Sequence, residues 1–102
     1  MPSVQERIDQ DVKGNKILFY MKGTPDAPQC GFSAQTVAVL QHYGVEFKSV
    51  NVLEDEEVRQ GIKEYSDWPT IPQLYVNGQF IGGCDIVMEL HGSGELKKIL
   101  EA

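Results

Sequence analysis

Hydrophobic residues recur at helical spacing near the start of the chain. Val4, Ile8 and Val12 fall on one helical face, and Ser3 stands three residues before Glu6. That spacing is typical of a capping box, in which the serine side chain binds a free backbone N–H of the first turn. The pattern predicts an N-terminal helix that begins after Ser3, and a glycine at position 14 is placed to end it.

A change of periodicity follows. Residues 17–21 form an unbroken apolar run, which is too short for a lone helix and fits a strand covered on both faces. Helical spacing returns over residues 32–43, with Gly44 at the predicted helix end, and residues 47–52 read as a second strand. This order predicts a right-handed unit of two parallel strands joined by a helix.

A third helix is predicted after Asp55, which can cap its free N–H groups. Val58 and Ile62 share one face of this helix. Arg59 and Lys63 lie four residues apart on a neighbouring face, where charged residues are usually solvated.

The last third of the chain alternates with period two. Residues 73–76 and 79–81 flank Asn77-Gly78, a pair favoured in type I′ turns, so an antiparallel hairpin is expected. Cys84-Asp85 stands at the start of a further helical stretch, and Ser93 is predicted to cap a last helix.

These elements predict an α/β fold with a mixed four-stranded sheet and helices on both faces. The chain has 102 residues, of which 41% are hydrophobic. This size suits a single domain over residues 1–102. No stretch approaches the ~20 apolar residues that a membrane-spanning helix needs.

The net charge limits the classes of partner that the chain can bind. Nine basic residues against 15 acidic ones give a net charge of −6, which disfavours nucleic acid and anionic membranes. An anionic ligand must therefore be held by a local cluster of positive groups. No targeting segment is readable, so the cytoplasm is the default compartment. An organellar matrix is the alternative, because a cleaved presequence would leave no trace. In a reducing compartment the two cysteines are expected to be free thiols.

The candidate chemistry centres on Cys30-Gly31-Phe32-Ser33, where a serine stands in place of a second redox cysteine. A thiolate is the nucleophile and metal ligand, so the pKa of Cys30 must be lowered. Its place before the helix start, with Lys22 at the end of the preceding strand, favours the thiolate. A buried, inert cysteine is the alternative, and the Gly and Pro residues around it argue for an exposed turn instead.

Four motifs together resemble the monothiol glutaredoxins, which have the thioredoxin-like fold. They are Lys22-Gly23-Thr24-Pro25, Cys30-Gly31-Phe32-Ser33, Trp68-Pro69-Thr70-Ile71-Pro72 and Gly82-Gly83-Cys84-Asp85. They occur in the family's order from Lys22 to Asp85.

The resemblance implies a glutathione site. Lys22 and Arg59 would hold the glycine carboxylate end, although each alone would be an ordinary solvated side chain. Lys63 is a weaker candidate that ordinarily faces solvent. A trans proline is the commoner state, but the resemblance implies that Pro72 is cis and that the Ile71 backbone pairs with the cysteinyl part of glutathione.

The resemblance implies that the last motif, Gly82-Gly83-Cys84-Asp85, binds the γ-glutamyl end of glutathione. The Cys84 backbone N–H would bind the γ-glutamyl carboxylate and Asp85 the ammonium group. Plain helix capping by Asp85 is the alternative. The Cys84 thiol is not the implied nucleophile, but it could resolve Cys30 if the fold brings the two together.

Several nearby residues have simpler interpretations. Phe32 is expected to shield the thiolate or contact glutathione, and Ser33 to cap the helix or face solvent. Trp68 fits either the core or the groove wall and is left unassigned. His42 and His91 lack metal-ligand spacing, so zinc and a Cys–His hydrolase are unsupported, and both are expected at the surface or its boundary.

A [2Fe-2S] cluster usually takes four thiolates, and Cys30 supplies one. The resemblance implies two chains and two glutathiones around one cluster, with Cys30 as the metal ligand of each chain. The leading hypothesis is an iron-sulfur cluster transfer protein that is a homodimer when loaded. A BolA-like protein and recipient apoproteins are the implied partners.

Two alternatives remain. The chain could be an oxidoreductase in which Cys30 removes glutathione from mixed disulfides and free glutathione resolves it. It could also be a non-catalytic thioredoxin-like module that binds a partner, with Cys30 incidental.

Overall fold

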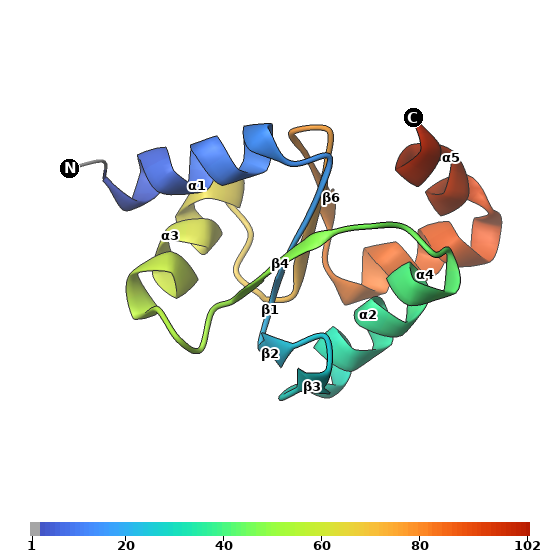
Figure 1. The fold of residues 1–102 in the computed structure, drawn as a ribbon, viewed down its shortest axis with the longest axis horizontal. Helices are drawn as coiled ribbons and strands as arrows, with labels where there is room; N and C mark the ends of the chain where they lie inside the picture. Colours follow the sequence, from blue (N-terminus) through green and yellow to red (C-terminus); the bar gives the residue numbers. More distant parts are fainter. Residues whose placement is uncertain (1–2) are drawn as a thin grey trace.

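The computed structural model describes residues 3–102 and shows five helices and six strands in that part of the chain (Figure 1). The helices are α1 (Val4–Gly14), α2 (Gly31–His42), α3 (Glu56–Ser66), α4 (Cys84–Ser93) and α5 (Glu95–Glu101). The strands are β1 (Ile17–Met21), β2 (Gly23–Thr24), β3 (Ala27–Pro28), β4 (Lys48–Asn51), β5 (Gln73–Val76) and β6 (Gln79–Gly82).

Four strands form the main sheet, in the order β4-β1-β5-β6. β1 runs parallel to β4 and antiparallel to β5, which confirms the predicted mixed sheet. All five residues of β1 are buried, as its unbroken apolar run predicted. The predicted second strand is shorter than residues 47–52, because regular pairing is confined to β4.

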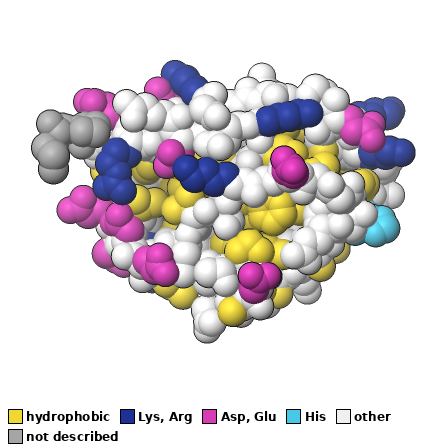
Figure 2. Space-filling model, in the orientation of Figure 1, with side chains coloured by type: hydrophobic (Ala, Val, Ile, Leu, Met, Phe, Trp, Pro, Cys, Tyr) yellow, Lys and Arg dark blue, Asp and Glu magenta, His cyan; other side chains and the backbone are white. Residues whose placement is uncertain are grey.

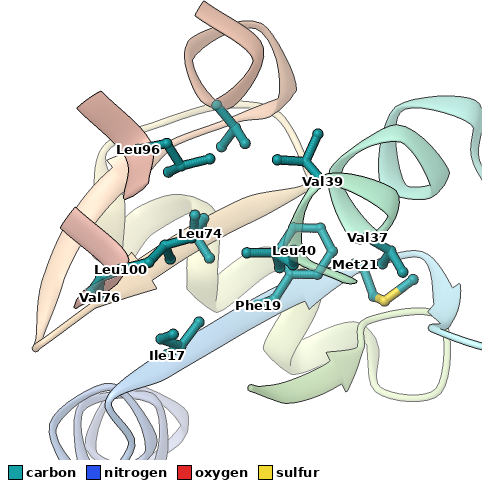
Figure 3. Packing of buried hydrophobic residues seen from close by; sticks show 11 residues of the cluster. Ile17, Phe19, Met21, Val37, Val39, Leu40, Leu74, Val76, Leu96 and Leu100 are labelled. Carbon is teal, nitrogen blue, oxygen red and sulfur yellow. The ribbon is translucent and has the colours of Figure 1, made fainter. Parts of the chain in front are cut away.

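Alternate side chains of β1 enter two separate hydrophobic clusters. Ile17, Phe19 and Met21 pack with residues of α2, α4 and α5, whereas Leu18 and Tyr20 pack with residues of α1 and α3 (Figures 1 and 3). The sheet therefore lies between two layers of helices, as predicted.

The predicted helix starts are largely confirmed. The Ser3 side chain accepts from the Glu6 N–H at 3.2 Å, and Asp55 accepts from the N–H groups of Glu57 and Val58. Ser93 was predicted to cap the last helix, and its Oγ does accept from the Glu95 N–H at the start of α5, at 3.4 Å. Ser93 is itself the last residue of α4, however, and the N-cap position of α5 is Gly94, at φ 82°. A serine cannot adopt this left-handed conformation as easily as the glycine that follows it.

The hairpin between β5 and β6 has the predicted turn. Asn77 and Gly78 both have positive φ, at 53° and 80°. A type I′ turn requires positive φ at both of these positions. Its strands pair in antiparallel register, with an irregularity between Leu74 and Tyr75.

A small hairpin of β2 and β3 joins β1 to α2, and the sequence did not predict it. Two-residue strands are too short to show a hydrophobic period. Gly23 lies at φ 92°, and a Cβ there would stand 2.6 Å from the Ala27 carbonyl oxygen. Only glycine fits this turn, which carries the chain toward Cys30.

Acidic side chains gather on the end of the molecule formed by α1 and α3, and hydrophobic ones show in the middle of the same face (Figure 2). Across residues 3–102, every helix is too short or too polar to span a bilayer.

Candidate functional site

A groove of about 490 Å³ lies where β1, the starts of α2 and α4, part of α3 and the segment before β5 meet. It contains the Cys30 position and every other residue that the sequence singled out as a site residue. Those eight residues are Lys22, Cys30, Phe32, Arg59, Ile71, Pro72, Cys84 and Asp85. The fold thus brings together motifs that are more than 60 positions apart in the chain.

Cys30 is the N-cap residue of α2 and is partly exposed. Its pKa is lowered from the ordinary value of 9.0, chiefly by the backbone N–H of Ser33. Partial burial opposes this shift, while the Phe32 N–H, the Lys22 charge and the Ser33 hydroxyl favour the thiolate. The predicted direction agrees with this result, although a single N–H contact contributes more than Lys22 does.

Ser33 is not the solvent-facing or capping residue that the sequence predicted. It is completely buried, and its Oγ accepts a hydrogen bond from the Lys22 N–H at 3.2 Å. The first turn of α2 packs beneath the end of β1, so the hydroxyl meets the backbone instead of water. A hydrogen-bonded hydroxyl therefore occupies the position where a second thiol would otherwise stand.

Three cationic side chains line the groove. Lys22 follows β1, and Arg59 and Lys63 lie one turn apart on α3. Lys63 was the weaker candidate, yet it also lines the groove and is only partly exposed. Among the residues described, none of the three forms an ion pair, so this acidic protein has a local positive site for an anion.

The segment before β5 forms another wall. The Ile71–Pro72 peptide bond is cis, as the resemblance implied, and Ile71 is buried with 6% of its surface exposed. Gln73, which the sequence analysis missed, donates from Nε2 to the carbonyl oxygens of Trp68 and Thr70, at 3.2 and 3.1 Å. A polar residue opening an otherwise apolar strand was the signal that could have identified it.

The start of α4 closes the groove. Gly83 is the N-cap residue and provides no side-chain cap, so Asp85 is not a capping residue and stays exposed. The Cys84 thiol is buried and donates to Gln35 Oε1 at 3.4 Å. Both cysteines carry free thiols. Free N–H groups and a carboxylate at one helix start suit a ligand end that carries both charges.

Two aromatic side chains border the groove. Phe32 is 59% exposed beside the thiol, and Trp68 is 37% exposed and packs against Phe80 with ring centroids 6.0 Å apart. Trp68, unassigned from sequence, is therefore a groove residue. Exposed aromatic rings at a concave site favour contact with a ligand or partner.

The two histidines lie away from the groove. His42 is exposed, and His91 is partly buried with its Nδ1 2.6 Å from the Tyr43 hydroxyl, so both have the surface or boundary positions predicted. Over residues 3–102, no group of three His, Cys, Asp or Glu side chains is arranged to hold a metal ion.

Comparison with known proteins identifies a family model and relatives that match most of the length of the chain. The glutaredoxin family model matches residues 17–81. The ycf64-like monothiol glutaredoxin of Synechocystis sp. is 56% identical over 100 residues, covering 98% of this chain and 94% of that protein. The mitochondrial monothiol glutaredoxin-5 of Lachancea kluyveri is 52% identical over 100 residues, covering 95% of this chain and 70% of that protein.

Solved structures give the same result for the fold. The solution structure of reduced apo GrxS14 from poplar has a TM-score of 0.85 and 50% identity, covering 99% of this chain and 93% of that chain. A buckwheat glutaredoxin–glutathione complex has a TM-score of 0.86 at 22% identity, covering 96% of this chain and 87% of that chain. This second likeness shows the shared thioredoxin-like fold alone.

Proposed function

The chain belongs to the monothiol glutaredoxins, and from this premise we propose that it binds glutathione and a labile [2Fe-2S] cluster and takes part in cluster transfer or assembly. The observation that carries the proposal is the arrangement at Cys30. Its thiol is partly exposed with a lowered pKa, and the neighbouring Ser33 hydroxyl is buried and bonded to Lys22. Position 33, where a second redox cysteine would stand, therefore supplies no thiol to Cys30.

The ligand count supports a shared cluster. Such clusters usually take four thiolates, and one chain offers Cys30, because Cys84 is buried. Two chains with two glutathiones supply four sulfurs, which fits a homodimer that exists when the cluster is bound. Two of the ligands would then be exchangeable small molecules, and this would make the cluster easy to pass on to a recipient protein.

The charged groups of the groove suit those of glutathione. Lys22 and Arg59 would hold its glycine carboxylate, and the Ile71 backbone beside Pro72 would pair with its cysteinyl part. Glutathione bound in this way would place its sulfur near the Cys30 thiol. The buckwheat glutaredoxin, which shares the fold, was itself solved with glutathione.

The start of α4 would take the other end of glutathione. The Cys84 backbone N–H would bind the γ-glutamyl carboxylate, and Asp85 the ammonium group. Phe32 would cover the ligand sulfur. We further propose one domain over residues 1–102, a BolA-like protein and recipient apoproteins as partners, and the cytoplasm as the compartment, with an organellar matrix as the alternative.

The test is anaerobic reconstitution with iron, sulfide and glutathione, followed by absorption spectroscopy and sedimentation. We expect a cluster spectrum and a dimer in the full mixture, and a monomer without cluster when glutathione is omitted. Cys30→Ser should lose the cluster. Cys84→Ser is the matched variant, because it changes the second thiol of the same groove while leaving the backbone in place.

The proposal fails if the wild-type protein takes up no cluster, or if Cys30→Ser keeps it. A cluster lost equally in Cys84→Ser and Cys30→Ser would mean that both thiols are ligands, which contradicts the shared arrangement.

The lowered pKa of Cys30 favours a second candidate, glutathione-dependent reduction of mixed disulfides. The Cys30 thiolate would attack the glutathione sulfur of a glutathionylated protein and release the protein thiolate. A second glutathione thiolate would then attack the Cys30–glutathione disulfide, giving oxidised glutathione and regenerating the Cys30 thiolate. Rapid turnover on a glutathionylated peptide would support this reaction. Partner binding that survives Cys30→Ser without glutathione or iron would instead support a non-catalytic module.

A further inference from the structure

The main chain at Lys22 is held by three hydrogen bonds from different parts of the fold. The Lys22 N–H donates to Ser33 Oγ at 3.2 Å, and the Lys22 carbonyl accepts from the Gln29 N–H at 2.9 Å. The next N–H along the chain, that of Gly23, donates to Asn51 Oδ1 at 2.9 Å. The backbone that carries this groove cation is therefore fixed from α2, from the segment before α2, and from β4.

Asn51 lies outside the groove and has two roles at the end of β4. Its Oδ1 also accepts from the Leu53 N–H at 3.0 Å. This contact forms a local turn of the kind that Asn favours. An amide oxygen has two lone pairs, and here both are used. The same atom thus stabilises the turn after β4 and holds the neighbouring segment after β1.

We propose that Asn51 is a positioning residue for Lys22, and that through this contact it raises the affinity of the groove for an anionic ligand end. The inference rests on the proposed function in taking glutathione as that ligand. Asn51 itself does not line the groove and would not touch the ligand.

Local packing explains why a backbone contact matters for this side chain. A lysine side chain is flexible, so its ammonium group samples a range of positions within reach of its backbone. The position of the Lys22 backbone therefore determines which part of the groove this range covers. Gly23 has φ 92° and no room for a Cβ, so the chain makes a tight turn directly after Lys22. Without the Asn51 acceptor, the buried Gly23 N–H loses its partner, and the turn can move to find another.

A double-mutant cycle on the full chain tests the inference, with glutathione affinity measured by calorimetry. Asn51→Ala should weaken glutathione binding about tenfold in the wild-type background. In a Lys22→Ala background it should have almost no further effect, because the two residues act through one contact. Ser49→Ala is the matched control, since it shortens another polar side chain of β4 and should leave affinity unchanged.

Amide hydrogen exchange gives a readout that needs no ligand. The Gly23 N–H should be protected in the wild type, exchange at least about tenfold faster in Asn51→Ala, and regain protection in Asn51→Asp, which keeps an acceptor oxygen. Equal glutathione affinity of Asn51→Ala and wild type would overturn the inference, as would additive effects in the cycle or unchanged Gly23 exchange. If the wild type and Ser49→Ala both fail to bind glutathione, the proposed function fails and so does the role in affinity. Gly23 exchange then decides separately whether Asn51 holds the Lys22 backbone.

Discussion

The starts of α2 and α4 face the same groove, and each places a cysteine there. Cys30 precedes the first turn of α2, is partly exposed, and has its pKa lowered chiefly by the Ser33 N–H. Cys84 is the first residue of α4, is buried, and directs its thiol to Gln35 on α2. Neither helix start has a side-chain cap.

This difference shows that a helix start alone does not make a thiol a nucleophile. The sulfur must also reach the free N–H groups and remain open to a reactant. Cys30 meets both conditions, because it lies one position before the helix. Cys84 lies inside the first turn, where its side chain packs against α2.

The largest expected effect is in thiol alkylation. At pH 7 and with iodoacetamide, Cys30 should be labelled on the order of a hundred times faster than Cys84. The reason is that Cys84 is only 7% exposed, whereas Cys30 is more open and has the lowered pKa. Mass spectrometry of the digested protein measures both sites. In denaturant the two rates should converge, and equal rates in the folded protein would contradict the comparison.

Ser33→Ala should reduce the reactivity of the Cys30 thiol at the start of α2. The pKa of Cys30 should rise toward 9.0, because one hydroxyl contact is lost. Alkylation at pH 7 should then slow about threefold. The Lys22 N–H also loses its acceptor. For that reason the free energy of unfolding should fall by about 2 kcal/mol.

Thr36→Val is the control for Ser33→Ala. It removes another buried hydroxyl of α2, one that donates to the Phe32 carbonyl oxygen and not to the Lys22 backbone. If Thr36→Val slows alkylation as much as Ser33→Ala does, the effect belongs to helix stability and not to the Ser33 hydroxyl.

A smaller effect is expected in the pH dependence of stability. The pKa of Cys30 is lower in the folded chain than its ordinary value of 9.0, so the folded state favours the thiolate. The resulting stabilisation should be complete above pH 9.0 and lost as the pH falls through the lowered folded value. Urea unfolding of the wild type and Cys30→Ser at several pH values measures it, and a difference that shrinks as the pH rises would have the wrong sign.

Gln35→Leu should have the smallest effect, because it removes only the acceptor of the Cys84 thiol. An S–H group is a weak donor, so the free energy of unfolding should change by no more than about 0.5 kcal/mol. Cys30 alkylation should stay the same, as a kinetic assay can check. A changed rate at Cys30 would show that the two helix starts are coupled through α2.

Much of the fold was predictable because its signals are local. The apolar run of β1, the caps at Ser3 and Asp55, and the Asn77-Gly78 turn each depend on a few neighbouring residues. The residues of the candidate groove were found through the family's motifs, since no local rule indicates that Lys22 and Asp85 share one groove.

Residues that act through distant partners were missed or misread. Ser33 was expected to cap the helix or face solvent, but it is buried, and its hydroxyl accepts from the Lys22 N–H after β1. Asn51 reads in sequence as an ordinary strand end, and its contact with Gly23 spans 28 positions. Such contacts depend on which segments the fold brings together, and hydrophobic periodicity carries no information about them.

The position of Trp68 gives the protein an optical property. It is the only tryptophan of the chain, it lines the groove, and its indole ring is partly in water and partly against Phe80. Tryptophan emission responds to the polarity around the ring, so the fluorescence of this protein comes from a single place beside its reactive thiol. A molecule that enters the groove and displaces water from the indole should shift that emission, and the unmodified protein can thus be titrated without an attached dye.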